Sequence, residues 1–191
     1  MYICPTNYLS TYMKHTILSL ILLAWGAQAY PQTTENVPSD ATFTPPFDFP
    51  ITFSGNFGEI RANHFHGGLD FKTGGTIGKP VHALAEGYIS RIRVTNGSGY
   101  VLDVCYHNGY STINRHLSGF VSPIAERVEK LQYEEESWEV EIVPEPEEYS
   151  VKGGQQIAWS GNTGYSFGPH LHLDVFETES GDYIDPMPFF Q

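Results

Sequence analysis

Two short clusters hold the side chains best suited to binding a metal ion. One is the pair His170 and His172, separated by one leucine, and the other is His66 with Asp70 four positions later. Alternate residues of a β-strand face the same side, so the two histidines of the pair point together if this segment is extended. Imidazole nitrogen and carboxylate oxygen are donors that zinc takes in tetrahedral catalytic sites, which keep one position open for water. Together the clusters predict a metal site.

Two glycines, Gly67 and Gly68, separate the residues of the first cluster. Glycine permits a tight bend and close backbone approach, which can bring an imidazole and a carboxylate to one ion. One histidine of the second cluster would then complete a set of two histidines and one aspartate. The chain contains no HExxH sequence, so the helical zinc-peptidase arrangement is excluded. Asp103 and Asp174 are both candidates for orienting an imidazole, and the sequence does not choose between them.

Three glycine-containing motifs lie far apart in the chain: HGGLD at residues 66–70, SGNTG at 160–164 and GPHLH at 168–172. Together they resemble the motifs of the lysostaphin/LytM-type zinc metallopeptidases, which are peptidoglycan endopeptidases. The segment at 110–118 resembles the part of that family that bears a further catalytic histidine, here His116. The resemblance extends from residue 57 to residue 188.

The resemblance implies a role for each of these residues and a fold to hold them. It implies that His66, Asp70 and His172 bind one Zn²⁺ per chain, and that His116 and His170 are the catalytic pair. The implied fold is all-β, an antiparallel sandwich-like peptidase core of the duplicated hybrid motif type, with zinc in a groove. The implied substrate is a peptidoglycan stem peptide or cross-link, and a regulatory protein partner stays open.

Two other functions stay open at this point. One is a non-catalytic module on the same scaffold that binds the cell wall or regulates another protein. Such modules usually lose metal ligands, whereas this chain keeps all three that the resemblance implies. The other is an exported zinc-dependent amidase that cuts the bond between sugar and peptide. A metal assay tests the first alternative, and mass analysis of the products tests the second.

The rest of the sequence predicts the elements that would position these side chains. The 19 glycines, 12 tyrosines and 12 phenylalanines are typical of turn-rich β-structure. Residues 79–92 are expected to form two strands joined by a turn at 86–87. Asn-Gly pairs predict hairpin turns at 96–97 and 108–109. Further strands are expected at 100–107, 110–117 and 171–176.

Residues 121–150 differ in character from the segments around them. They contain ten glutamates and only two basic residues. Ile124, Val128 and Leu131 follow a spacing of four and then three, which predicts a short helix with one apolar face. We therefore expect an insertion that carries a short helix and lies on the surface of the domain, with its charges solvated.

The N-terminal segment has the pattern of an export signal. Lys14 precedes an apolar run at residues 16–25 that is too short to anchor the chain in a membrane. The sequence AQA at 27–29 supplies a small-residue cleavage site. We predict a signal peptide at residues 1–29, for which Met13 is a more ordinary start than Met1. The mature protein is expected to be periplasmic or extracellular and not to span the membrane.

The length of 191 residues suits one domain. A polar stretch rich in proline and threonine predicts a linker at residues 30–46, followed by one zinc metallopeptidase domain at 47–191 that includes the insertion. The formal net charge is −12. Nucleic-acid binding needs clustered lysine and arginine, so this charge argues against a nucleic-acid partner.

Overall fold

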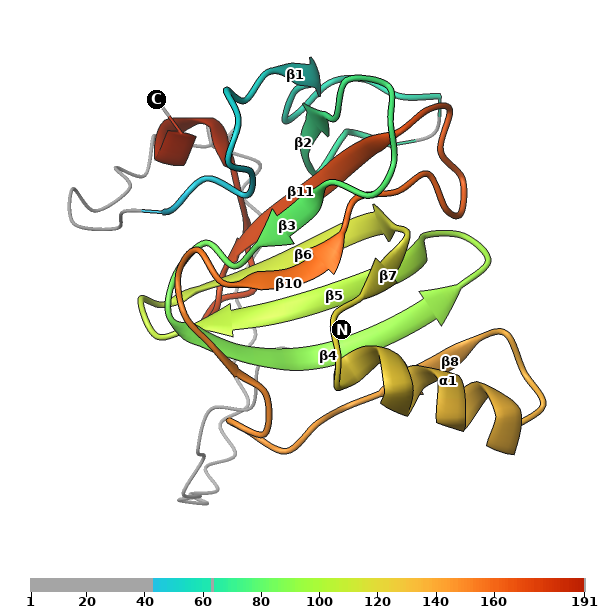
Figure 1. Cartoon of the computed structure of the whole chain (residues 1–191). Coiled ribbons are helices and arrows are strands. Elements are labelled where there is room, and N and C mark those ends of the chain that lie inside the picture. Colours follow the sequence, from blue (N-terminus) through green and yellow to red (C-terminus); the bar gives the residue numbers. More distant parts are fainter. Residues whose placement is uncertain (1–42, 63, 191) are drawn as a thin grey trace, which may run out of the picture.

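The fold is built almost entirely from β-strands (Figure 1). The computed structural model describes residues 43–62 and 64–190. The predicted signal peptide at 1–29 and most of the predicted linker lie outside the described residues. Within the described ranges, no helix has the length and apolar character needed to cross a membrane.

The larger sheet has nine strands and carries most of the predicted site residues. Its strands follow the order β1-β2-β11-β6-β5-β4-β8, while β12 pairs with β11 and β9 pairs with β4. Neighbouring strands are antiparallel throughout. The bounds are β1 Phe53–Gly55, β2 Gly68–Lys72, β4 Gly87–Thr95, β5 Gly99–Tyr106, β6 Tyr110–Leu117, β8 Val140–Ile142, β9 Ser150–Val151, β11 His170–Glu177 and β12 Tyr183–Ile184.

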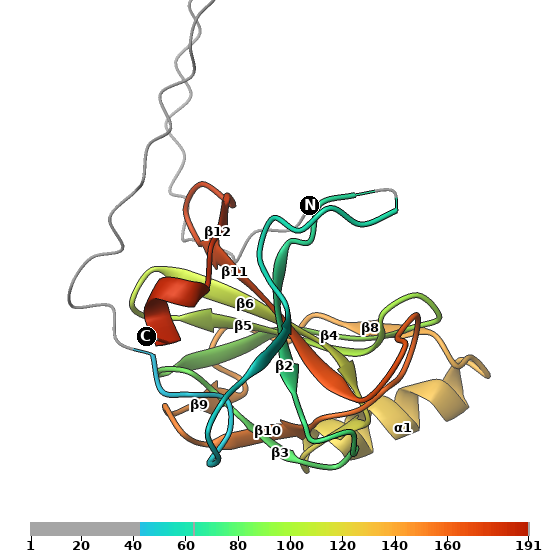
Figure 2. The ribbon, with the colours of Figure 1, turned by 90° about the horizontal axis from the view of Figure 1, so that it is seen from above.

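A second sheet of three strands packs on the first. It has the order β3-β10-β7, with β3 at Pro80–His82, β10 at Gln156–Trp159 and β7 at Gly119–Phe120. Figures 1 and 2 show this small sheet against one face of the large one. The last element of the described residues is a short 3-10 helix at Met187–Phe190. The two layers confirm the antiparallel, sandwich-like all-β core implied by the resemblance.

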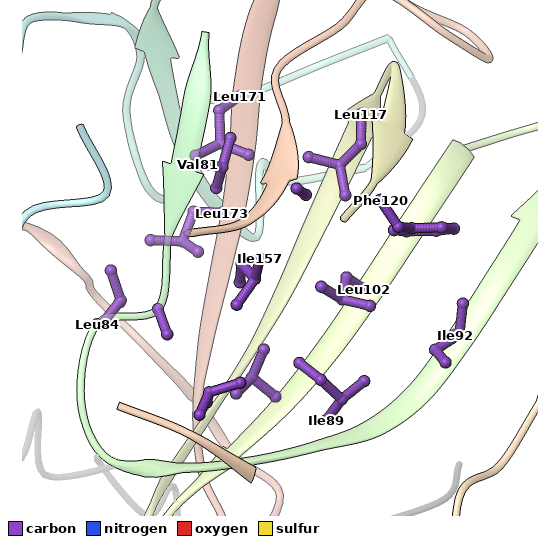
Figure 3. Packing of buried hydrophobic residues seen from close by; sticks show 14 of the residues in the cluster. Val81, Leu84, Ile89, Ile92, Leu102, Leu117, Phe120, Ile157, Leu171 and Leu173 are labelled. Atoms are coloured by element: carbon purple, nitrogen blue, oxygen red, sulfur yellow. The ribbon is translucent and has the colours of Figure 1, made fainter. Parts of the chain in front are cut away.

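The core lies between the two sheets and fixes which way β11 faces. Leu171 and Leu173 are fully buried there. Figure 3 shows them in one cluster with Val81 of β3, Ile157 of β10 and Leu102 of β5. Because side chains alternate along a strand, burial of these leucines turns His170 and His172 of β11 to the opposite face. The hydrophobic effect thus positions the predicted metal ligand of this strand.

The expected hairpins are confirmed, whereas one expected strand pair is wrong. The turns at 96–97 and 108–109 connect β4 to β5 and β5 to β6. The segment 79–92 does form two strands, but β3 pairs with β10 while β4 pairs with β5, so the two lie in different sheets. Ala83 and Leu84 between them are buried, because the chain passes through the core from one sheet to the other.

The insertion at 121–150 contains the expected short helix, α1, at Ile124–Glu134. It also contributes β8, which pairs with β4 and extends the large sheet. Ile124 and Val128 of the helix and Val140 of β8 are buried in the main core. The expected insertion with its short helix is thus confirmed, and a few of its apolar residues also pack into the core of the domain. The apolar positions between its glutamates carry this packing.

The chain packs against the domain from residue 43 onward. Phe43 is buried and stacks on Phe189, with ring centroids 4.5 Å apart. The amide of Thr44 donates to the carbonyl of Leu84 at 2.7 Å. The last residues of the segment expected as a linker thus contact the core.

Candidate metal centre

The three predicted ligands, His66, Asp70 and His172, converge at one point. Asp70 on β2 lies directly opposite His172 on β11, and His66 comes from the loop before β2. The Nε2 of His66, the Nδ1 of His172 and the Oδ1 of Asp70 are each 3.0 Å from the other two. All three residues are buried. The structure therefore brings together donors that are far apart in the chain.

Glycine allows the two strands of the site to lie this close. A Cβ placed on Gly68 would overlap the carbonyl of Leu173 on β11. Any larger residue at this position would push β2 away from β11. The Asp70 carboxylate would then move away from the imidazole of His172. Gly68 thus has a structural role beyond permitting a bend, because it allows β2 to approach β11.

The donor set fits a zinc ion. With bonds of about 2.0–2.1 Å, two ligands of tetrahedral zinc lie roughly 3.3 Å apart, close to the spacing seen here. Two imidazole nitrogens and one carboxylate oxygen leave one tetrahedral position open, as in catalytic zinc sites. Because three lone pairs repel one another, so close a grouping requires a cation or a proton between them.

Each ligand is held by a partner on its other side. The Nδ1–H of His66 donates to the carbonyl of Asn56 at 2.8 Å, which leaves Nε2 for the metal. The Nε2–H of His172 donates to Oδ1 of Asp174 at 2.7 Å, which leaves Nδ1. The guanidinium of Arg61 donates to Oδ2 of Asp70 at 3.1 Å, so only Oδ1 faces the site. Such partners fix ring orientation and tune ligand basicity.

Of the two candidate orienting carboxylates, the structure selects Asp174. Asp103 pairs instead with Arg93 at 2.6 Å. Arg115 lies opposite His172 on β6 and holds Asp174 with two nitrogens, at 2.9 and 2.8 Å. Sequence reasoning missed Arg115, because its contact depends on the register between β6 and β11.

Asp174→Asn is expected to weaken zinc binding by about 10- to 100-fold, the usual cost of losing a partner of a metal ligand. An asparagine has only one acceptor oxygen, so it cannot serve both His172 and Arg115. Competition with a chromogenic chelator measures the affinity. Asp103→Asn is the matched control, since it disrupts an aspartate–arginine pair that does not involve a ligand. Equal zinc affinity in Asp174→Asn and wild type would contradict this role.

Protonation of His172 should compete with the metal. Burial lowers the pKa of His172, but hydrogen bonds to Asp174 and Asp70 raise it more, to about 9. Burial alone would raise the pKa of Asp70, but its hydrogen bonds to His172 and His66 hold that pKa well below its usual range. In the metal-free protein at neutral pH, an imidazolium thus lies against a carboxylate. This proton supplies the positive charge that the donor group requires.

Zinc binding is therefore expected to release this proton, because a ligating imidazole must offer a lone pair. Apparent zinc affinity should rise with pH until the pKa of His172, about 9, is reached. The expected slope is about tenfold per pH unit for one proton. Calorimetry at pH 7 in two buffers of different ionisation enthalpy measures the protons released. Affinity that does not change with pH would contradict the expectation.

The two predicted catalytic histidines lie beside the ligands. The ring centroids of His116 and His170 are 5.0 Å apart, and Nε2 of His170 is 3.6 Å from Oδ1 of Asp70. The Nδ1–H of His116 donates to the carbonyl of Thr163 at 2.9 Å, and that of His170 to the carbonyl of Gly168 at 2.8 Å. When such a ring carries its proton on Nδ1 alone, Nε2 is the proton acceptor.

His116 has an unusual backbone conformation. Its φ is 62°, in the left-handed region that few residues other than glycine adopt. The pairing of β5 with β6 is irregular at this point, since Tyr100 pairs with Leu117 and Leu102 with Asn114. The extra residue forms a β-bulge, which bends a strand and re-aims a side chain. Strain of this kind concentrates at functional sites.

An open cleft of about 1560 Å³ contains all five predicted residues. This volume exceeds the roughly 300–1,000 Å³ of small-molecule sites, so it suits an extended substrate. Phe65, Tyr165 and Phe167 line the cleft with largely exposed rings. His64 lines it as well.

Several known proteins that this chain resembles are named as peptidases. The chain is 32% identical over 133 residues to a glycyl-glycine endopeptidase, ALE-1, of Staphylococcus capitis; the match covers 68% of this chain and 29% of that protein. The structure of this chain resembles the catalytic domain of lysostaphin from Staphylococcus simulans, with a TM-score of 0.54 and 28% identity. The match covers 73% of this chain and 91% of that one. The structure also resembles a zinc-containing peptidase from Vibrio cholerae, with a TM-score of 0.57 and 25% identity over 76% of this chain and 39% of that one.

No protein-family model matches the chain. The chain spans less than a third of the length of the curated relatives it matches. The solved lysostaphin domain, in contrast, is matched over nearly its whole length. From its sequence relatives and its fold, the chain belongs to the lysostaphin/LytM-type metallopeptidases.

Proposed function

We propose that this protein is a zinc-dependent endopeptidase that hydrolyses peptide bonds in peptidoglycan stem peptides or cross-links. The observation that carries the proposal is the convergence of His66, Asp70 and His172 beside two further histidines in an open cleft. When bound, zinc would act as a Lewis acid on the scissile carbonyl and would activate water near neutral pH. The relatives named as endopeptidase and lysostaphin support a peptide substrate.

His116 and His170 would move the protons of the reaction. Hydrolysis of an amide requires a base to take a proton from water and an acid to give one to the leaving amine. Both histidines offer an acceptor Nε2, and their Nδ1–H groups are held by backbone carbonyls. His116 and His170 would divide these two proton transfers between them, next to the three proposed metal ligands. An extended peptide would contact the exposed rings of Phe65 and Phe167 along the cleft.

The site of action follows from the substrate. Peptidoglycan lies outside the cytoplasmic membrane, and the predicted signal peptide at 1–29 would export the chain to it. We therefore place the mature enzyme in the periplasm or outside the cell.

The test is hydrolysis of purified peptidoglycan by the purified chain. We expect zinc near one per chain, release of soluble muropeptides, loss of release with a chelator, and recovery with added zinc. Mass analysis should show new peptide termini, whereas an amidase would separate whole stem peptides from the sugar. Zinc-loaded, folded protein that releases nothing would overturn the proposal and favour a non-catalytic wall-binding or regulatory module.

A further inference from the structure

We propose that Lys72 binds a carboxylate of the substrate, and that the enzyme prefers peptides with a free carboxylate close to the scissile bond. The inference rests on the proposed function and specifies its substrate class. It starts from the charges along the cleft. The residues lining it include three cations, Arg61, Lys72 and Arg115, and two carboxylates, Asp70 and Asp174.

The cleft differs in charge from the rest of the molecule. The whole chain has a formal net charge of −12, yet no glutamate lines the cleft among the described residues. Arg61 is paired with Asp70, and Arg115 with Asp174. A divalent ion at the site would add further positive charge. An anionic group on a substrate would therefore meet a favourable potential in this cleft and a repulsive one elsewhere.

Lys72 is the third cation of the cleft, and it belongs to neither of these two ion pairs. It is exposed, and among the described residues no carboxylate forms an ion pair with it. It lies two positions after Asp70 on β2 and directly opposite His170 on β11. Alternate residues of a strand share a face. The ammonium group of Lys72 therefore lies on the same side of the sheet as the metal ligands and the catalytic pair.

The backbone of Lys72 is firmly held. Its amide donates to the carbonyl of Thr52 at 2.8 Å. The following turn is closed by two side-chain hydrogen bonds, from Thr73 to the carbonyl of Thr76 at 2.7 Å and from Thr76 to that of Thr73 at 3.0 Å. The buried Thr73 fixes where β2 ends. The lysine thus extends from a fixed point, and only its side chain must be ordered to bind a substrate.

The spacing limits where the carboxylate would lie. Residues two apart on a strand are about 7 Å apart, and an extended peptide advances about 3.3–3.6 Å per residue. A carboxylate within about two or three residues of the scissile bond would therefore be in reach of the ammonium. Stem peptides carry free carboxylates near their cross-links, whereas a glycyl-glycine bond, named for the relative from Staphylococcus capitis, has no charged side chain.

The test uses two synthetic cross-linked stem peptides that differ only next to the scissile bond, where one has free diaminopimelate carboxylates and the other has carboxamides. For the zinc-loaded wild type, kcat/KM is expected to be about three- to tenfold higher for the carboxylate peptide at low salt. High salt should reduce this preference, because an exposed ion pair is screened. Lys72→Met should bring the ratio close to one, and Lys72→Arg should keep part of it.

Lys152→Met is the matched control, since Lys152 is an exposed lysine outside the cleft. It should keep the wild-type ratio. The same pair of peptides is also measured by equilibrium binding to zinc-loaded protein. If neither peptide is cut, the proposed function fails, while the ratio of dissociation constants still decides the role of Lys72. Equal binding of both peptides to wild type, or an unchanged preference in Lys72→Met, would overturn the inference.

Discussion

Asp70→Ala is expected to abolish zinc retention and, with it, all hydrolysis. The Oδ1 of Asp70 is the only anionic donor among the three converging ligand atoms. Without it, two imidazoles would have to hold a divalent ion alone. Loss of a residue that hydrogen-bonds to a metal ligand typically lowers metal affinity by about 10–100-fold, and loss of the ligand itself should lower it more. Metal analysis after gel filtration should give about one zinc per chain for wild type and almost none for the variant.

Thermal unfolding provides a second measurement for Asp70→Ala. A ligand that binds only the folded state stabilises it by about 2.7 kcal/mol at a concentration 100 times its dissociation constant. Added zinc should thus raise the melting temperature of wild type but not that of the variant. Asp103→Ala is the control, because it removes a carboxylate paired with Arg93 and should keep the response to zinc. A folded Asp70→Ala protein with full zinc content would show that the ligand assignment is wrong.

The convergence of His66, Asp70 and His172 could be predicted from sequence because local rules place these residues. Alternation along one strand turns His172 away from the core leucines, and the glycines before Asp70 allow close approach of β2 to β11. The resemblance then specified which residues meet.

Other parts of the site depend on tertiary structure that no local pattern encodes. The contact of Arg115 with Asp174 requires the register of β6 against β11. The left-handed conformation of His116 requires a bulge whose position depends on pairing with β5. Local sequence patterns predict β3 and β4 as strands. They do not predict that the two strands lie in different sheets, because this also depends on tertiary structure.

His116→Asn is expected to keep zinc and lose hydrolysis by about 10²–10⁴-fold, the usual contribution of positioned proton transfer. Asparagine tolerates the left-handed backbone that His116 adopts at φ 62°, so the β-bulge should persist. His116→Ala serves as the second variant, because it lacks any polar side chain. Zinc content and melting temperature should match wild type in His116→Asn, while kcat on peptidoglycan peptides falls. Such a separation distinguishes a proton-transfer residue from a metal ligand.

The pH profile gives an independent check on His116. Burial lowers the pKa of His116 to about 4, although its hydrogen bond to Thr163 acts in the opposite direction. The imidazole is therefore neutral, and able to accept a proton, at every pH clearly above that value. With zinc kept saturating, kcat of the wild type should show no loss from His116 between pH 8 and about pH 5. Because the base form is the active form, its loss should begin only as the pH approaches about 4. Two results would show that His116 does not act as this buried base. One is a fall in kcat of the wild type near pH 6.5 that is absent in His116→Asn. The other is full hydrolysis by that variant.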